Sequence, residues 1–503
     1  MQNQITIVGK LKKFLLNFWP LILILVVAGF MMFFRLGRDS FWDWDECIYS
    51  QYGKTMKLTG NFLTNQWLGQ ARLEKPPLYS WLLQVPYLFG INEFNARVLS
   101  VIATFVLLIF VYFFAKKFFS ERVAVLSTLL MLTAETLVVY SIRVNTDTFF
   151  TLFIFLGFFF WILSDKKSKF SYLSGLFFAS SVMVKGLGIT AYLTAIFLSI
   201  LINFKREKFM NFIKMLSSFL VLIVPWHIYE YFTYGNQFIH VYIVENLIQR
   251  AKNPIEFHFG GRLFYIKLAY EELQPWILAI IILPLFYLLK LKKYLSLKAA
   301  GKELRSKEIL FTLLLLIIIP FISISSIQTK IAWYLMPIYP FLAIFLAYSL
   351  DLLLKNIRHH FLSTGLMWLF ILLIATDAFW LLYRETKFYQ SYPDISPRNK
   401  VAIISRNYPQ KSLDYLVQFS ERRGRETLAP NLTTSTTFVY GGNACAVYYS
   451  DKKVNYYYST TDFVQRVKRG GGLYLIENGD LHFINQLPVK TLYKNSDFKL
   501  FEN

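Results

Sequence analysis

Cysteine, histidine and charge are all scarce in this sequence. Cys47 and Cys445 are its only cysteines and lie far apart. Two such residues exclude a disulfide framework and a cysteine-based metal site, and they leave the redox compartment open. There are six histidines, and 17% of the 503 residues are charged. A mean hydropathy of +0.42 over the whole chain excludes an ordinary soluble protein.

Apolar stretches long enough to cross a bilayer recur through the first three-quarters of the chain. A membrane-spanning helix needs about 17–25 predominantly apolar residues. The sequence therefore predicts a polytopic α-helical membrane protein. The first span lacks a small-residue cleavage site, so we expect a retained helix rather than a signal peptide. We place the spans at residues 15–34, 96–115, 123–140, 148–164, 170–184, 187–203, 209–228, 275–290, 309–327, 331–352 and 361–383.

Basic residues are distributed unevenly among the loops. A net charge of +22 would point to nucleic acid in a soluble domain, but cytoplasmic loops and anionic lipids account for it here. We therefore expect membrane lipids as partners and no nucleic acid. Every second loop is basic, which predicts a cytoplasmic N-terminus and an external C-terminus. These loops contain Lys116, Lys117 and Arg122; Lys166, Lys167 and Lys169; Lys205, Arg206 and Lys208; residues Lys290 to Lys307; and Lys355 and Arg358.

The character of the sequence changes after about residue 383. Strand-like runs there lie between Gly, Asn and Asp turn signals, which predicts a small extracytoplasmic α/β domain. We therefore divide the chain into a membrane domain, residues 1–383, with outer loops at 35–95 and 229–274, and an outer domain, residues 384–503. No Lys-Ser/Thr follows Gly470-Gly471-Gly472, so we interpret this run as a turn and not a phosphate loop. The predicted strands include Val401–Ser405, Thr437–Tyr440, Ala446–Tyr449 and Leu473–Ile476.

Three carboxylates gather at the start of the first outer loop. Asp43, Asp45 and Glu46 follow the first span directly and are interleaved with one phenylalanine and two tryptophans. Tryptophan favours the headgroup zone of a bilayer, where partly desolvated acids are costly unless they have partners or a function. A solvated loop is the alternative interpretation. The pattern favours a catalytic site.

A rigid Glu-Lys pair closes the same loop. Pro76 and Pro77 fix the backbone directly after Glu74 and Lys75 and stop any helix there. A Lys held beside a Glu predicts an anion or metal site, and a local ion pair at a bend is the alternative. Between the two clusters, residues 54–63 have the pattern of a short amphipathic helix ending at Gly60, typical of a segment lying on a membrane surface.

Together these motifs resemble those of the GT-C glycosyltransferases, in the branch that contains protein O-mannosyltransferases and lipid A aminoarabinose transferases. The stretches that carry the resemblance are Asp45-Glu46, Gly60-Asn61-Phe62-Leu63 and Glu74-Lys75-Pro76-Pro77-Leu78. Further similar elements are Arg143 with Asp147; Lys185-Gly186; Pro225-Trp226, Gly235, Phe238, Glu245-Asn246, Arg250 and His258; and Lys330, Tyr334, Pro337 and Pro340. One departure is Ile48, which stands where the aminoarabinose enzymes often have Arg.

The resemblance implies a bacterial inner-membrane enzyme with about 11–13 membrane helices. Such an enzyme transfers a sugar from undecaprenyl phosphate to an extracytoplasmic acceptor by inverting displacement. The reaction needs a base on one face of the sugar and cations for the leaving phosphate on the other. We assign the role of base to Asp45. We expect Glu46 to orient Asp45 or bind the sugar, and Asp147 to position the acceptor or the sugar. The candidates for the phosphate site are Lys75, Lys185, Arg250, Arg262, Lys330 and Tyr334.

The cofactor and the acceptor are the remaining expectations. No cofactor is required by a monophosphate leaving group, but the resemblance implies that Glu74 and His258 join in binding a divalent ion such as zinc. Lipid A or lipopolysaccharide is the expected acceptor, and a protein is the alternative. A lipid or lipid-linked-sugar transporter is the alternative of another class. Transporters place ionisable groups at the bilayer midplane, often on repeated helices. Here Glu135 is the one acid deep in a predicted span, and no repeat is visible.

Overall fold

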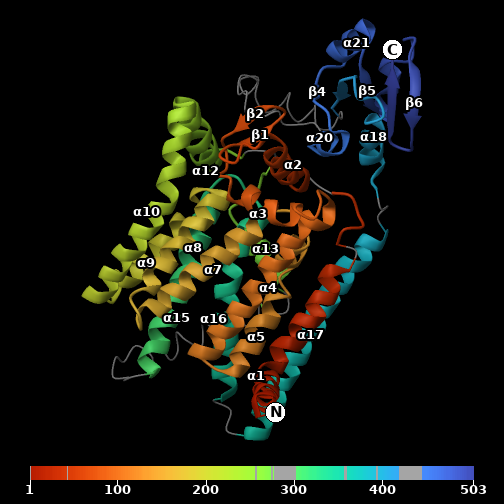
Figure 1. The fold of residues 1–503 in the computed structure, drawn as a ribbon. Helices are drawn as coiled ribbons and strands as arrows, with labels where there is room; N and C mark the ends of the chain where they lie inside the picture. Colours follow the sequence, from red (N-terminus) through yellow and green to blue (C-terminus); the bar gives the residue numbers. More distant parts are fainter. Residues whose placement is uncertain are drawn as a thin grey trace.

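Long apolar helices make up most of the fold (Figure 1). The structure, a computed structural model, describes residues 2–34, 36–41, 44–254, 258–273, 276, 302–355, 359–391, 395–417 and 444–503. Within these ranges, seven segments are long and apolar enough to cross a membrane. They comprise α1 (Gln2–Phe33), α4 (Glu93–Phe118), α7 (Asp147–Ser164), α10 (Arg206–Tyr234), α15 (Lys302–Ser326), α16 (Tyr339–Lys355) with the 3-10 turn Ala332–Ile338 before it, and α17 (His360–Ser391).

The other predicted spans are shorter or broken helices. Helices α5 (Glu121–Met131) and α6 (Glu135–Ser141) replace the span predicted at 123–140 and are bent by 73°. The shorter apolar helices α8 (Phe170–Lys185) and α9 (Thr190–Ile202) match two more predictions, and the span predicted at 275–290 lies outside the described residues.

The break between α5 and α6 corrects the prediction for Glu135. This residue is the first of α6 and pairs with Arg384 of α17 at 2.7 Å, with both side chains about half exposed. It is therefore not buried in the middle of a span. The new helix start is capped by the buried carboxylate of Glu272, which accepts hydrogen bonds from the backbone N–H of Thr136 at 3.4 Å and from the Thr136 hydroxyl.

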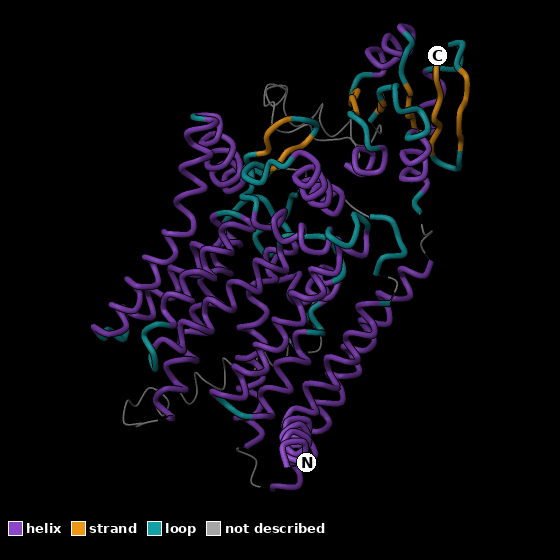
Figure 2. Tube along the Cα trace, in the orientation of Figure 1, coloured by secondary structure: helices purple, strands orange, loops and turns teal. Residues whose placement is uncertain are grey.

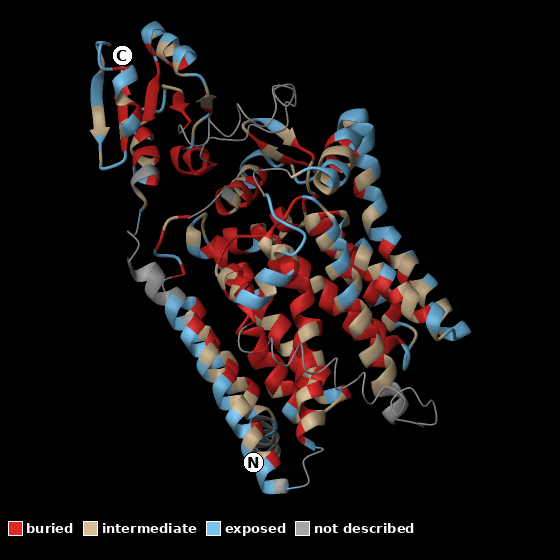
Figure 3. Cartoon of the chain, turned by 180° about the vertical axis from the view of Figure 1, so that it is seen from behind, coloured by how far each residue is buried: buried red, intermediate tan, exposed pale blue. Residues whose placement is uncertain are grey.

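Helix α7 forms the centre of the bundle. It packs against α8 and α4, while α8 in turn packs against α10 and α5 against α16. In the apolar stretch of α7, 89% of the residues are buried, whereas the value is 22% in the apolar stretches of α1, α10 and α17. Exposed residues follow α17 along its length (Figure 3), and they include Phe361, Trp368 and Leu372. Apolar side chains on the outside and inside of a bundle are typical of helices surrounded by lipid.

The basic loops meet at one end of the bundle. Lys116, at the end of α4, donates a hydrogen bond of 2.7 Å to the Asn17 carbonyl oxygen of α1. Lys208 of α10 pairs with Glu308 of α15 at 2.9 Å and with Asp165, after α7, at 3.9 Å. The described basic loops therefore lie on one side of the bundle, as the alternating pattern predicts. Residues 290–301 and Arg358 lie outside the described ranges.

The opposite end is covered by short elements. They are α2 (Trp44–Thr59), a hairpin of β1 (Asn65–Trp67) and β2 (Gln70–Arg72), and α3 (Leu78–Tyr87). The predicted amphipathic helix is confirmed at its end, where Gly60 has a φ of +70°, but it begins at Trp44 rather than near residue 54. Pro77 precedes the first residue of α3, so the two prolines do separate hairpin and helix.

The second outer segment, residues 229–274, is mostly helical in the part that the structure describes. Helix α10 continues through Tyr234, and it is followed by α11 (Asn236–Ile239) and a π-helical stretch, His240–Gln249. Then come α12 (Arg250–Lys252) and α13 (Phe264–Glu272).

The C-terminal domain is an α/β unit above the same end of the bundle, as predicted (Figure 2). Its sheet has the order β4-β3-β5-β7-β6, in which β4, β3 and β5 are parallel and β7 is antiparallel to β5 and β6. The strands are β3 (Leu413–Leu416), β4 (Val454–Tyr457), β5 (Leu473–Glu477), β6 (Lys490–Lys494) and β7 (Phe498–Glu502). The helices are α18 (Pro397–Ser405), α20 (Ala444–Ser450), α21 (Thr460–Arg469) and the 3-10 turn Asn478–Phe483.

Two of the four predicted strands are helices instead. Val401–Ser405 lies in α18, which starts with Ser396 as N-cap and Pro397 in its first turn. Ala446–Tyr449 lies in α20, every residue of which is buried. A short buried helix and a buried strand have the same continuous apolar run, so periodicity cannot separate them. Leu473–Ile476 is confirmed as part of β5, Gly470 and Gly471 form a turn with positive φ, and Thr437–Tyr440 lies outside the described residues.

The two cysteines form a disulfide between α2 and α20. The Cα atoms of Cys47 and Cys445 lie 5.0 Å apart although 398 residues separate them in the sequence. Two cysteines make no framework, but they do form this one bond, which was not predicted from the sequence. The bond joins the C-terminal domain to the helix that follows the first span.

The close approach of α8 and α10 depends on Gly175. A methyl group there would overlap the Met215 carbonyl oxygen and the Ser218 hydroxyl of α10, whereas one at Gly365 of α17 would meet nothing within 4 Å. We expect Gly175→Ala to destabilise the protein by about 1–3 kcal/mol, the usual cost of overpacking. Gly365→Ala, the matched control, should leave stability unchanged or slightly raised. Thermal unfolding in one detergent compares them, and equal midpoints would contradict the role of Gly175.

Candidate active site

Helix α2 carries an acid and two phenols at successive turns. Asp45 is half-buried in its first turn, where the positive end of the helix dipole favours a carboxylate. Tyr49 and Tyr52 are buried one and two turns later. Burial raises the pKa of the Tyr49 phenol well above its ordinary value, and the neighbouring charges of Asp45 and Asp147 raise it further. Tyr49 is therefore a neutral phenol with two carboxylates close by.

Glu74 and Lys75 each contact a different tyrosine of α2. The Lys75 ammonium donates to the Tyr49 hydroxyl and lies 4.7 Å from the centre of its ring. The Tyr52 hydroxyl donates to Glu74 at 2.9 Å, and the second, buried oxygen of this half-buried residue accepts no hydrogen bond from the residues that the structure describes. The local Glu74–Lys75 ion pair that we considered as the alternative is not formed. The turn is anchored instead by the Asn65 amide, which donates to the Lys75 carbonyl oxygen at 3.1 Å.

Asp147 and Lys185 form an ion pair beside Tyr334. Asp147 is buried in the first turn of α7, and the Lys185 ammonium at the end of α8 donates to it. The same ammonium lies 4.9 Å from the centre of the Tyr334 ring, and it is within electrostatic range of Lys75 and Asp45. Gly186, with a φ of +96°, ends α8 directly after Lys185. The sequence-predicted residues Asp45, Lys75, Asp147, Lys185 and Tyr334 are thus brought together.

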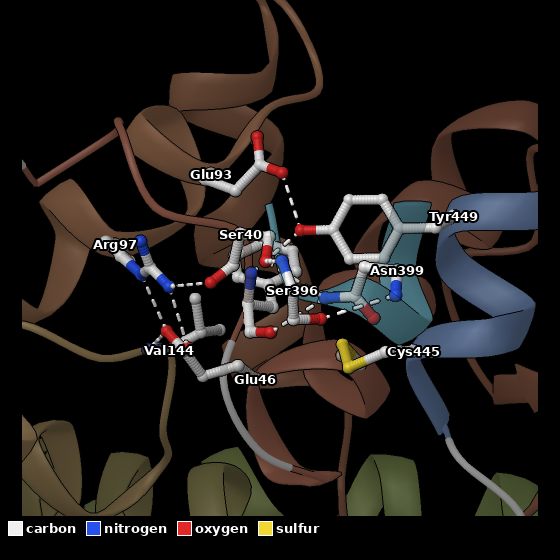
Figure 4. Close-up of a disulfide and its surroundings, with 11 residues drawn as sticks. Ser40, Glu46, Glu93, Arg97, Val144, Ser396, Asn399, Cys445 and Tyr449 are labelled. Atoms are coloured by element: carbon white, nitrogen blue, oxygen red, sulfur yellow. Dashed lines mark hydrogen bonds and ion pairs between the residues drawn. A yellow bond between two sulfur atoms is a disulfide. The ribbon is translucent and has the colours of Figure 1, made fainter. Parts of the chain in front are cut away.

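Glu46 is buried in a bidentate ion pair and not free to contact a sugar (Figure 4). Its two oxygens accept from Nε and Nη2 of Arg97 at 2.8 and 2.9 Å, and one also accepts from the Val144 N–H at 3.0 Å. The remaining donors of Arg97 bind the carbonyl oxygens of Leu36, Asp39 and Ser40 at 2.7–3.1 Å. This geometry favours orientation over sugar binding for Glu46.

The other three predicted cations lie on separate segments, Lys330 after α15, Arg250 in α12 and Arg262 before α13. Lys330 is buried, and its ammonium donates to the carbonyl oxygens of Ser325 at 2.7 Å and Ile327 at 2.5 Å, which closes the end of α15. Burial lowers its pKa. Arg250 is half-buried in α12, and Arg262 is exposed. The backbone joins these pieces, because the Thr329 N–H donates to the Arg250 carbonyl oxygen at 3.3 Å.

The predicted metal ligands lie in different surroundings. The His258 ring packs edge-on against Trp333 at 5.9 Å, whereas Glu74 lies beside Tyr52. Across the described ranges, no group of three or more His, Cys, Asp or Glu side chains is placed to hold a metal ion. We therefore derive no step through a metal.

Tyr49, Tyr52 and Arg97 were not among the site residues predicted from the sequence. Both tyrosines lie at helical spacing from Asp45, so a helix begun at Trp44 would have revealed them. Arg97 had no comparable signal. It lies in the second turn of a long apolar helix, and its acidic partner is 51 residues away.

The sequence is similar to a known protein family and to several individual proteins. Residues 74–229 match the model of the dolichyl-phosphate-mannose-protein mannosyltransferase family. An uncharacterised protein of Aquifex aeolicus is 26% identical over 385 residues, which cover 74% of this chain and 70% of that protein.

Several relatives bear the name undecaprenyl phosphate-alpha-4-amino-4-deoxy-L-arabinose arabinosyl transferase. The protein of this name from Pseudomonas aeruginosa (strain LESB58) is 24% identical over 383 residues, 74% of this chain and 67% of its own length. One from Pseudomonas fluorescens (strain Pf-5) is 28% identical, but over only 27% of this chain and 25% of its own length.

Solved structures show the same fold. The crystal structure of ArnT from Cupriavidus metallidurans bound to undecaprenyl phosphate aligns with a TM-score of 0.70 at 14% identity, over 96% of this chain and 97% of that one. The oligosaccharyltransferase AglB from Archaeoglobus fulgidus aligns with a TM-score of 0.55 at 12% identity, over 92% of this chain and 70% of that one.

Proposed function

We propose that this chain, which belongs to the GT-C glycosyltransferases of the protein O-mannosyltransferase and lipid A aminoarabinose transferase branch, transfers a sugar from undecaprenyl phosphate to lipid A. It is a membrane enzyme that uses a lipid-linked donor. The observation that carries the proposal is the cluster of Asp45, Lys75, Asp147 and Lys185 around the buried phenol of Tyr49, at the end of the bundle opposite the basic loops. Carboxylates and ammonium groups side by side are what this transfer requires.

In the proposed reaction, Asp45 removes the proton from the acceptor hydroxyl as its oxygen attacks the anomeric carbon. The bond between that carbon and the donor phosphate oxygen breaks on the opposite face of the sugar. The leaving undecaprenyl phosphate carries the electron pair, and the Lys75 ammonium stabilises its growing charge. Because attack and departure occur on opposite faces, the configuration is inverted.

The remaining predicted residues have supporting roles in this proposal. Lys185, Tyr334 and Arg250 complete the phosphate site, and Asp147 keeps Lys185 in place through their ion pair. Arg262 contributes as an exposed cation at the rim, and Lys330 supports Tyr334 by fixing the end of α15. A divalent ion such as zinc at Glu74 and His258 stays a prediction.

Two alternatives are less favoured. Transfer to a protein fits the mannosyltransferase family model, but that match covers residues 74–229, whereas the arabinosyl transferase of Pseudomonas aeruginosa (strain LESB58) matches over 74% of the chain. A transporter places its ionisable groups at the bilayer midplane. In the described residues, the candidate groups of this chain lie at one end of the bundle, on α2, the turn before α3, and the termini of α7 and α8.

Orientation follows from the proposed function. The protein crosses the membrane several times, and we propose that it does so in a bacterial inner membrane with the basic loops cytoplasmic and the C-terminal domain periplasmic. This places the site where lipid A is accessible.

Thiol labelling tests this orientation, because the two native cysteines are bonded to each other. We expect Gln465→Cys, exposed in α21, to react with an impermeant maleimide added outside spheroplasts. Lys167→Cys, exposed between α7 and α8, should react only after permeabilisation. The opposite pattern would overturn the proposed orientation.

Transfer itself is tested on Asp45. We expect Asp45→Asn to bind the lipid donor and to lower the single-turnover transfer rate by about 10²–10⁴-fold, the usual contribution of a general base. Asp462→Asn is the matched control, since Asp462 is an exposed aspartate in α21, and it should react like the wild type. Near wild-type transfer by Asp45→Asn would show that Asp45 is not the base.

A further inference from the structure

The C-terminal domain is attached to the chain on both sides of Asp45. The Cys47–Cys445 disulfide joins α20 to α2 just after Asp45 and Glu46. Before Asp45, the Tyr449 hydroxyl of α20 accepts a hydrogen bond of 2.7 Å from the Phe41 N–H and donates one of 2.6 Å to Glu93 of α4. Figure 4 shows these groups around the disulfide.

Further contacts extend this attachment over the linker between α1 and α2. The Asn399 side chain of α18 donates to the Ser40 hydroxyl and to the Phe41 carbonyl oxygen, both at 3.1 Å. The centre of the Phe41 ring lies 5.3 Å from the Arg97 guanidinium and 4.9 Å from the centre of the Tyr448 ring. Further along α2, Lys54 pairs with Asp451.

The attachment holds the back of the helix that carries the base. Successive residues of a helix are about 100° apart, so Cys47 lies roughly half a turn away from both Asp45 and Tyr49. Arg97 fixes the Glu46 carboxylate from the side of α4. The first turn of α2 is therefore held by the membrane domain on one side and by the C-terminal domain on another.

We propose that the C-terminal domain is a clamp for the catalytic helix, in which Cys47, Cys445 and Tyr449 are positioning residues for Asp45. This inference rests on the proposed function, because it assigns Asp45 the role of base. The clamp sets the distance between the Asp45 carboxylate and the acceptor hydroxyl. The Lys75 turn also contacts α2, through Tyr49 and Tyr52, but its backbone is held independently of that helix by the Asn65 amide and the two prolines. Loss of the clamp should therefore slow chemistry and leave donor binding nearly unchanged.

The test compares purified full-length wild type, Cys47→Ser/Cys445→Ser and Tyr449→Phe in nanodiscs. Transfer kinetics give kcat and the KM for the undecaprenyl-phosphate donor, and hydrogen exchange reports the protection of the α2 amides. Dithiothreitol provides a second route in the wild type. Dithiothreitol supplies two electrons and two protons, which convert the S–S bond into two thiols. The reagent itself is oxidised to a cyclic disulfide.

We expect the double variant to lose kcat by about ten- to a hundredfold, the effect of a misplacement of roughly 1 Å in a catalytic group. Its KM should change little, its α2 amides should exchange faster, and dithiothreitol should have no further effect on it. Tyr449→Phe should also lower kcat, but by a smaller factor. If the double variant does not fold, Tyr449→Phe alone tests the clamp.

Unchanged kcat and unchanged α2 exchange in both variants would overturn the clamp. If the wild type transfers no sugar, the proposed function is wrong. The hydrogen exchange of the α2 amides then tests the clamp without the kinetics. Faster α2 exchange in the double variant would then support it, and unchanged exchange would overturn it.

Discussion

The buried ion pair between Glu46 and Arg97 is the interaction on which the outer end of the bundle depends. One guanidinium binds both oxygens of Glu46 and three carbonyl oxygens of the linker from α1, and Glu46 in turn holds the Val144 N–H before α7. Four segments thus meet at one charge. Removing one partner of such a pair costs about 3–5 kcal/mol because the other charge is left buried and uncompensated. The pair sets the place of α2 and of Asp45 at its start.

Charge balance explains how a lipid phosphate can enter this site. Asp147 neutralises Lys185, whereas the Lys75 ammonium contacts the neutral phenol of Tyr49 and forms no ion pair within the part of the chain that the structure describes. A phosphate beside Lys75 exchanges a hydrogen bond to a phenol for a stronger charge-assisted one. The high pKa of Tyr49 keeps the phenol protonated, so it does not compete as an anion. Asp45 lies near the same phenol, so the proposed base and the proposed phosphate-binding cation are both neighbours of Tyr49.

Much of the membrane domain could be predicted from the sequence, because a bilayer imposes the length and polarity of a span. The turn at Gly60 and the break at Pro76 and Pro77 were equally readable, since both are local backbone constraints. The predictions failed where a partner distant in the sequence decides the outcome. Arg97 needs Glu46, Cys47 needs Cys445, and α6 needs the Glu272 carboxylate for its start. Helix α20 was predicted as a strand because burial of every residue removes the periodicity that distinguishes the two. The segment Val401–Ser405 of α18 is too short an apolar run to separate them.

The central claim is that this chain binds a polyprenyl phosphate at Lys75, and the lipid that co-purifies with it tests this most directly. Native mass spectrometry of the detergent-extracted wild type should detect undecaprenyl phosphate or its sugar derivative. A charge-assisted contact contributes about 1.5–3 kcal/mol, so Lys75→Ala should lower the affinity for added undecaprenyl phosphate by about ten- to a hundredfold. Lys468→Ala, which removes an exposed lysine of α21, should bind it like the wild type. Equal affinity in Lys75→Ala and the wild type would contradict the account.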